Sequence, residues 1–184
     1  MDEASDRLLV EQTRGGQIDA FGELVRRYQT SVFNVCYRLL GDPAEAEDLT
    51  QDAFLRAYRR LESYDVDRPF GPWMRRVAAN LCLNAMQRRE PPTVQIDEEF
   101  DQAEDEEPRM PEAALVRRAS AERVRSALHA LPPHYRMVIE LRHYQEMRYD
   151  DIAAELGLTL AEVKTRLYRA RRAIANLLVD PEHG

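Results

Sequence analysis

Apolar residues recur along most of this chain every three or four positions, the spacing that places them on one face of an α-helix. The clearest pattern covers residues 20–40 and ends at Gly41, and further patterns cover residues 7–13, 43–61 and 70–89. No stretch alternates between apolar and polar residues for long enough to predict a strand. The first half of the chain is therefore expected to be entirely helical.

The helix predicted at residues 43–61 has a strong start signal. Asp42 can cap it, Pro43 suits the first helical position, and Glu45 stands where a capping box requires an acid. The positions expected to be buried in the three main helices are Phe21, Leu24, Val25, Tyr28, Val32, Val35 and Leu39, then Ala46, Leu49, Ala53, Ala57 and Leu61, and then Trp73, Val77, Leu81 and Ala85.

The composition changes between residues 90 and 111, where four prolines and a strongly acidic run replace the apolar periodicity. Residues 97–107 hold eight acids and no base, so this run carries the net charge of −7 and leaves the rest of the chain close to neutral. Such a segment cannot build a core and is typical of a flexible linker. We predict two small helical domains, residues 1–90 and 112–184, joined by an acidic linker at residues 91–111.

Composition also excludes several classes of protein. No apolar run approaches the roughly 18 residues of a spanning helix, and the N-terminus lacks the pattern of a secretory signal. We therefore expect a cytoplasmic protein without membrane contact. Cys36 and Cys82 stand in apolar surroundings and are expected to be small buried residues. The four histidines show no metal-ligand spacing, and no nucleophile–base pair or phosphate-binding glycine loop is present, so neither a metal, a cofactor nor an enzyme is predicted.

Residues 151–172 have the spacing of a helix-turn-helix. A short helix ends at Gly157, which suits a left-handed C-cap, and Thr159 with Glu162 forms a capping box for a longer helix that reaches about residue 178.

The segment of residues 164–172 contains five bases and no acid. Basic and hydroxyl side chains there could reach phosphates and base edges, and the capped turn itself could favour a phosphate. The alternative is an ordinary solvated helix surface. The candidate DNA-binding residues are Lys164, Thr165, Tyr168, Arg169 and Arg171.

The first half carries two further candidate surfaces. On the helix at residues 43–61, the apolar pair Phe54 and Leu55 lies beside polar residues and suggests a protein-docking face. The alternative is an ordinary solvated side of the helix. The candidate docking residues are Asp48, Gln51, Asp52, Phe54, Leu55 and Arg56. Between residues 64 and 84, aromatic, basic and amide side chains suit single-stranded DNA, whose bases stack on rings and whose phosphates need charge. Trp73 could equally be a core residue. The candidate residues are Tyr64, Asp65, Arg68, Phe70, Trp73, Arg76, Asn80 and Asn84.

Four segments together resemble the extracytoplasmic-function (ECF) sigma factors of the sigma-70 family. They are residues 47–58 (EDLTQDAFLRAY), 70–80 (FGPWMRRVAAN), 131–153, which opens with LPPHYR and closes with YDDIA, and 163–171 (VKTRLYRAR). These segments occur in the family's order, and the match as a whole extends over nearly the whole chain, with the acidic linker in place of the family's third region.

The resemblance implies an alternative sigma factor that directs promoter-specific transcription initiation and is not an enzyme. Its first domain would bind the clamp of core RNA polymerase through the residue 48–56 face and melt the minus-ten element, with the loop at residues 64–69, Asn80 and Asn84 holding flipped bases. Its second domain, which would meet the polymerase flap, would read the duplex minus-thirty-five element. The linker would run through polymerase channels, unless it is a plain spacer. A monomer controlled by an anti-sigma factor in a stress response is the expected arrangement.

Two departures from the family pattern affect base recognition. The recognition helix opens with residues 159–162 (TLAE) where the family often has a glycine-rich turn, and the loop at residues 65–69 (DVDRP) holds more acid than is usual. A conventional helix-turn-helix regulator that binds duplex DNA without polymerase is the main rival interpretation.

Overall fold

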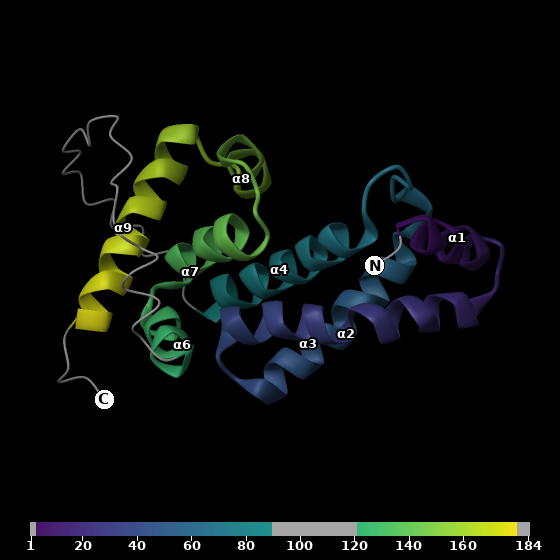
Figure 1. Cartoon of the computed structure of the whole chain (residues 1–184), viewed down its shortest axis with the longest axis horizontal. Coiled ribbons are helices and arrows are strands. Elements are labelled where there is room, and N and C mark those ends of the chain that lie inside the picture. The colour runs from purple at the N-terminus through teal and green to yellow at the C-terminus, as the bar shows by residue number, and fades with distance from the viewer. Residues whose placement is uncertain (1–2, 90–120, 180–184) are drawn as a thin grey trace. The chain divides into compact units, whose positions relative to one another are not determined.

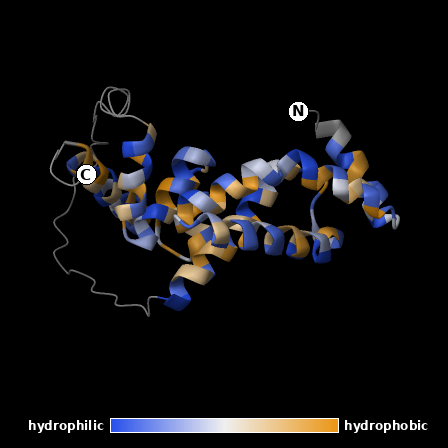
Figure 2. Ribbon diagram, turned by 90° about the horizontal axis from the view of Figure 1, so that it is seen from below, coloured by the Kyte–Doolittle hydropathy of each residue, from blue (hydrophilic) through white to orange (hydrophobic). Residues whose placement is uncertain are grey.

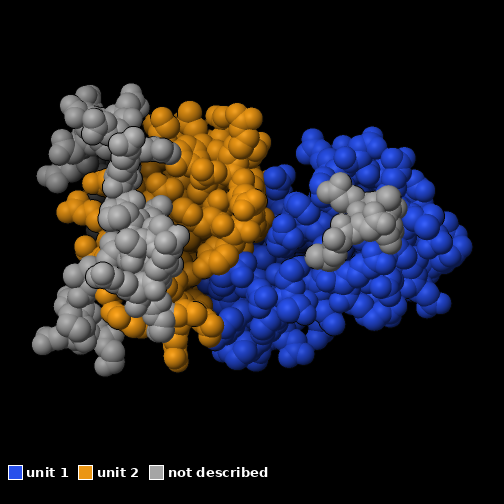
Figure 3. All heavy atoms as spheres, in the orientation of Figure 1, with its two compact units in different colours: residues 1–86 blue, residues 87–184 orange. Residues whose placement is uncertain are grey.

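The computed structural model describes residues 3–89 and 121–179, and every regular element within them is helical, as predicted (Figure 1). The chain divides into two compact units, residues 1–86 and 87–184 (Figure 3). The predicted linker at residues 91–111 and the helix start expected near residue 112 lie outside the described residues, so the exact domain boundaries stay a prediction. The elements are α1 (Glu3–Arg14), α2 (Ile18–Leu40), α3 (Pro43–Arg59), η1 (Leu61–Ser63), α4 (Phe70–Arg89), α6 (Ala121–Ala130), α7 (Pro133–Ile139), η2 (Glu140–Tyr144), α8 (Tyr149–Leu156) and α9 (Leu160–Val179).

In the first unit, α2 packs against both α1 and α3. Its buried stripe follows the predicted positions, except that Val25 is only half-buried and that Ala20 and Cys36 join the stripe. The ring of Phe21 packs edge-on against Phe54 of α3 at a centroid distance of 6.4 Å. Apolar and polar faces alternate around the helices in Figure 2, as expected when each helix buries one face.

The predicted signals at the α2–α3 junction are confirmed. Gly41 ends α2 with φ 81°, a left-handed conformation in which glycine has no Cβ to clash. Asp42 caps α3 by accepting a hydrogen bond from the backbone N–H of Glu45 at 2.9 Å. The helix ends at Arg59 and η1 follows, so the predicted end at Leu61 was two residues too late.

The helix α1 is longer than the predicted residues 7–13. A buried polar cluster links it to α2 by hydrogen bonds. Asp6 is 5% exposed, and its carboxylate accepts hydrogen bonds from the Tyr28 hydroxyl and from Nη1 of Arg27, the latter at 3.0 Å. Burial and the Asp6 hydrogen bond raise the pKa of Tyr28, because both disfavour the phenolate. A buried carboxylate needs such partners to offset its lost hydration.

The predicted buried face of α4 was wrong by about one position. The buried residues are Phe70, Gly71, Met74, Ala78, Ala79, Leu81, Cys82 and Met86, whereas Trp73, Val77 and Ala85 are only half-buried. Small and apolar residues lie almost all round this helix, so periodicity alone could not choose between adjacent faces. A Cβ built on Gly71 would lie 2.7 Å from the Tyr28 ring, which shows how closely the start of α4 approaches α2.

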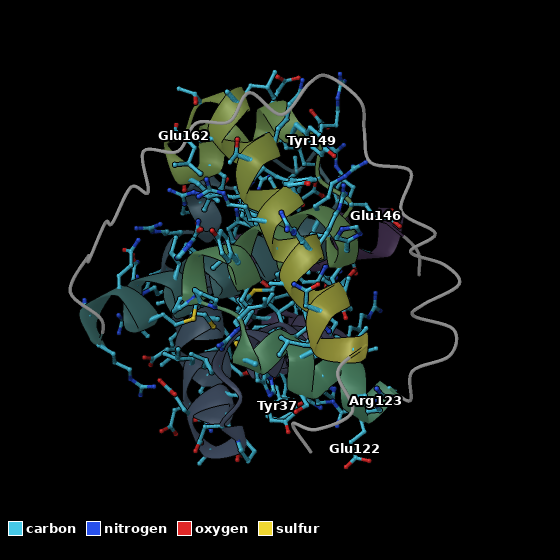
Figure 4. All side chains as sticks on the ribbon, turned by 90° about the vertical axis from the view of Figure 1, so that its left-hand side faces the viewer. Tyr37, Glu122, Arg123, Glu146, Tyr149 and Glu162 are labelled. Atoms are coloured by element: carbon cyan, nitrogen blue, oxygen red, sulfur yellow. The ribbon has the colours of Figure 1, made fainter. Side chains whose placement is uncertain are left out.

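In the second unit, α6, α7 and α8 all pack against α9. The core includes Leu128, Leu131, Met137, Leu141 and Ile152, which are each at most 5% exposed. Arg123 of α6 donates a hydrogen bond to the carbonyl of Leu178 at 2.7 Å and so satisfies a carbonyl near the C-terminus of α9 (Figure 4). No helix in the described part of the chain is long and apolar enough to cross a membrane.

Candidate nucleic-acid and protein interfaces

The predicted helix-turn-helix is present. The helix α8 spans Tyr149–Leu156 as expected, Gly157 follows with φ 65°, and α9 begins at Leu160. Ile152, Val163, Leu167 and Ala170 are at most 1% exposed and form the contact between the two helices and their neighbours. Ala153, Leu156 and Ile174 on the same two helices are half-buried.

The exposed side of α9 carries the candidate DNA-binding residues, which we call the α9 face. At 100° per residue its members fall within an arc of about 160° opposite the buried stripe. Lys164 and Tyr168 are exposed, and Thr165, Arg169 and Arg171 are half-exposed. The face thus combines three cations, a hydroxyl and an aromatic ring, a set that can contact both phosphates and base edges.

The first turn of α9 forms the predicted capping box in full. Thr159 N–H donates to Glu162 Oε2 at 2.7 Å, and Glu162 N–H donates to Thr159 Oγ1 at 3.2 Å. The backbone N–H and the hydroxyl of Thr159 both donate to Glu162 Oε2, and these two hydrogen bonds, with the nearby charge of Arg166, hold the pKa of Glu162 below its usual range. A carboxylate therefore lies at the electropositive end of α9 (Figure 4), and binding of a phosphate at this turn stays a prediction.

The candidate docking residues of α3 occupy one exposed side, which we call the α3 face, with one exception. Asp48, Gln51, Asp52, Leu55 and Arg56 are exposed, and Leu55 is 54% exposed despite its apolar side chain. Phe54 is only 6% exposed and packs on Phe21, so its assignment to the docking surface is corrected to a core role. One position along a helix rotates a side chain by about 100°, which is enough to separate Phe54 from Leu55.

The candidate residues for single-stranded DNA divide into a core group and a surface group. Tyr64 and Phe70 are 6% and 2% exposed, and their rings lie 4.6 and 5.4 Å from the Trp73 ring, measured between centroids. These two rings therefore support Trp73 from the core instead of offering stacking surfaces themselves. Trp73 itself is half-buried.

The surface group lies on one side of α4 and on the preceding loop. Trp73, Arg76, Asn80 and Asn84 follow one another at spacings of three and four residues, so they share one side, which we call the α4 face. Asp65 and Arg68 are exposed in the loop of residues 64–69, and their side chains form an ion pair at 3.4 Å. The loop and the α4 face together offer an aromatic edge, amides and cations.

Comparisons with known proteins show which family the chain belongs to. The model of Sigma-70 region 2 matches residues 24–91, and that of Sigma-70 region 4 matches residues 121–174. The chain is 33% identical over 179 residues to the ECF RNA polymerase sigma factor SigW of Bacillus subtilis, with 93% of this chain and 95% of that protein covered. The chain belongs to the ECF sigma factors. It is therefore an alternative sigma factor, a protein that directs transcription initiation.

Other relatives agree with this assignment. The ECF RNA polymerase sigma-E factor of Escherichia coli K12 is 33% identical over 182 residues, with 95% of each chain covered. Among solved structures, CnrH in complex with the cytosolic domain of CnrY superposes with a TM-score of 0.62 at 28% identity and covers 95% of this sigma factor and 97% of that chain. RpoE of Bartonella quintana, solved with the anti-sigma factor NepR, has the same fold, with a TM-score of 0.61 at 22% identity over 88% of this chain and 98% of that one.

Proposed function

We propose that this sigma factor binds core RNA polymerase through the α3 face, holds the melted minus-ten strand on the loop of residues 64–69 and the α4 face, and reads the minus-thirty-five element with the α9 face. The main observation that supports this proposal is the charge of the α9 face. It concentrates cations on the exposed side of a helix-turn-helix in a chain whose net charge is −7, so the DNA-binding charge is local.

The physical chemistry of each surface fits its proposed partner. Arginine can bind guanine through two parallel hydrogen bonds, and Arg169 and Arg171 retain partial exposure for this contact. Holding a flipped base requires contacts that offset a few kcal/mol of lost stacking, and Trp73 with nearby amides can provide them. On the α3 face, Leu55 supplies an exposed apolar centre, and the acids around it supply charge selectivity.

The remaining parts of the proposal concern regulation and location. CnrH was solved with the cytosolic domain of CnrY, and RpoE of Bartonella quintana was solved with the anti-sigma factor NepR. These complexes of proteins with a similar fold support control of this sigma factor by an anti-sigma protein. We further propose that it acts in the cytoplasm as a monomer, without a cofactor and without catalytic activity of its own. The acidic run, which lies outside the described residues, would serve either as a channel-bound mimic of nucleic acid or as a spacer.

The first test is gel filtration of the purified protein with bacterial core RNA polymerase, followed by run-off transcription on a library of genomic fragments. Co-elution with new discrete transcripts is expected. A shift of duplex DNA by the protein alone, without co-elution, would instead favour a conventional regulator.

Two charge-reversal variants test whether the α3 face binds core RNA polymerase. Asp52→Arg should abolish co-elution, because it reverses charge at the centre of the α3 face. Glu47→Arg makes the same charge change on an exposed position of the same helix, about 140° around the axis, and should co-elute normally. Equal assembly by both variants would remove the α3 face from the interface.

Arg169→Ala should lose about 1–3 kcal/mol of discrimination between matched and mismatched minus-thirty-five sequences. Arg125→Ala, which removes an exposed arginine from α6 in the same unit, serves as the control. Unchanged transcription across a promoter series would show that Arg169 does not read bases.

A further inference from the structure

One arginine of α1 donates hydrogen bonds to the backbone carbonyls at the start of the proposed base-binding loop. Nε and Nη2 of Arg14 donate hydrogen bonds to the carbonyl of Leu61 at 3.1 and 2.7 Å. Nη2 also reaches the carbonyl of Glu62 at 3.4 Å and that of Tyr64. Three carbonyls that are 47 to 50 residues distant in the sequence thus converge on one planar guanidinium.

The loop that begins at this point is closed by its own hydrogen bonds. The backbone N–H of Arg68 donates to the carbonyl of Asp65 at 3.1 Å, and the N–H of Asp67 donates to the Asp65 side chain at 3.1 Å. The Tyr64 hydroxyl donates to the carbonyl of Arg68, which draws the end of the loop back to its start. Asp65, one of the acids that depart from the usual family loop, therefore helps to build the turn with its side chain.

A second contact joins α1 to the far side of the loop. Nη1 of Arg7 lies 3.2 Å from Asp67 Oδ1, with the two side chains 53% and 80% exposed. An ion pair this exposed contributes little by itself, so it supports the Arg14 contacts and does not replace them. The helix can act as a fixed support because Asp6 is bound to Tyr28 and Arg27, and because Val10 is fully buried.

A loop that must hold a flipped base gains from being fixed beforehand. Each residue that is ordered only on binding loses backbone entropy, and this loss would be subtracted from the binding energy available to select a base. Binding sites discriminate well when their contacts are held by supporting hydrogen bonds. The Tyr64 ring also contacts Trp73 on the α4 face, so fixing the backbone at Tyr64 also helps to fix the position of the Trp73 ring.

We propose that α1, which precedes the residues matched by the model of Sigma-70 region 2, holds the loop of residues 64–69 in its base-binding conformation, and that Arg14 is a positioning residue for recognition of the minus-ten base. This inference rests on the function proposed above. It gives the first helix a part in promoter selectivity in addition to packing.

The test measures base discrimination by the holoenzyme. Holoenzymes made with wild-type protein, Arg14→Ala and Arg14→Lys are titrated with fluorescent single-stranded minus-ten oligonucleotides that carry either the preferred base or another base at each position. Arg14→Ala should lower the ratio of affinities at one position at least threefold. Arg14→Lys should lower the ratio partly, because a single ammonium cannot meet three carbonyls in the plane that a guanidinium provides. Arg26→Ala removes an exposed arginine of α2 that pairs with Glu23 and is the matched control.

A merely structural role of Arg14 would reduce the active fraction and would scale all affinities alike without changing the ratio. Unchanged ratios in both Arg14 variants would therefore overturn the inference. If Arg14→Ala does not fold, the ratio of affinities measured with Arg14→Lys decides whether the inference holds. Wild-type protein that fails to assemble with core polymerase would overturn the proposed function and this inference together, whereas assembly with unchanged variant ratios would overturn only the inference.

Discussion

The contact between Gly71 and Tyr28 provides a quantitative test of how unit one is packed. Gly71 lies in the first turn of α4, and the added methyl of Gly71→Ala would stand 2.7 Å from a carbon of the Tyr28 ring. That ring cannot move away easily. It is 5% exposed, its hydroxyl donates to Asp6, and its centroid lies 5.4 Å from that of Phe70. We expect the variant to lose stability although alanine is the better helix former.

The magnitude follows from two opposing effects. Replacing glycine by alanine inside a helix gains about 1 kcal/mol, and less in the first turn. Forcing an extra carbon into a packed core costs about 1–3 kcal/mol. The net expectation for Gly71→Ala is a loss of about 1 kcal/mol. In α2, a Cβ on Gly22 would meet only Arg26 Nη1 at 3.7 Å, so Gly22→Ala should gain up to about 1 kcal/mol.

The assay uses the single tryptophan of the chain, Trp73, whose fluorescence reports the unfolding of unit one. Urea denaturation of wild-type protein, Gly71→Ala and Gly22→Ala should place the two variants on opposite sides of the wild-type midpoint, about 2 kcal/mol apart. If both variants were stabilised equally, the close approach of α4 to α2 would be refuted. Preserved promoter melting by Gly71→Ala would show that the approach serves stability alone.

The remaining predictions concern two titratable groups. The raised pKa of Tyr28 means that the folded protein keeps a proton that the unfolded chain releases above about pH 10, so stability is full below that pH and falls above it by up to about 1.4 kcal/mol per pH unit. Tyr28→Phe should remove this part of the alkaline slope, as urea midpoints between pH 8 and pH 11 will show, and an identical slope in both proteins would contradict the burial of its hydroxyl beside Asp6. Glu162→Gln keeps the hydrogen bonds with Thr159 but removes a negative charge from the DNA-facing end of α9, so we expect duplex minus-thirty-five DNA to bind about two- to fivefold more tightly at low salt. Fluorescence anisotropy, with Glu122→Gln on α6 as the control, measures this gain, and an unchanged affinity would place the carboxylate away from the phosphates.

The features that the sequence determined by itself are those set by neighbouring residues. The caps at Asp42, Gly157 and Thr159 depend on contacts within four residues, and each lies where its motif predicts. The buried stripe of α2 and the bounds of α4 and α8 follow from periodicity bounded by glycine, proline or capping residues. The four family segments identified the sigma factor for a similar reason, since each is a short run of residues with a recognisable pattern.

The tertiary structure decided which side of an ambiguous helix is buried and which distant groups meet. Only tertiary packing distinguishes Met74 from Trp73 as the core residue of α4, and the packing of Phe54 on Phe21 removes Phe54 from the α3 face. No sequence signal connects Arg14 with carbonyls 47 or more residues away, because backbone acceptors carry no residue identity. Local rules specify the helices and their ends, whereas the burial of each side chain and the reach of a long arginine depend on how those helices are packed together.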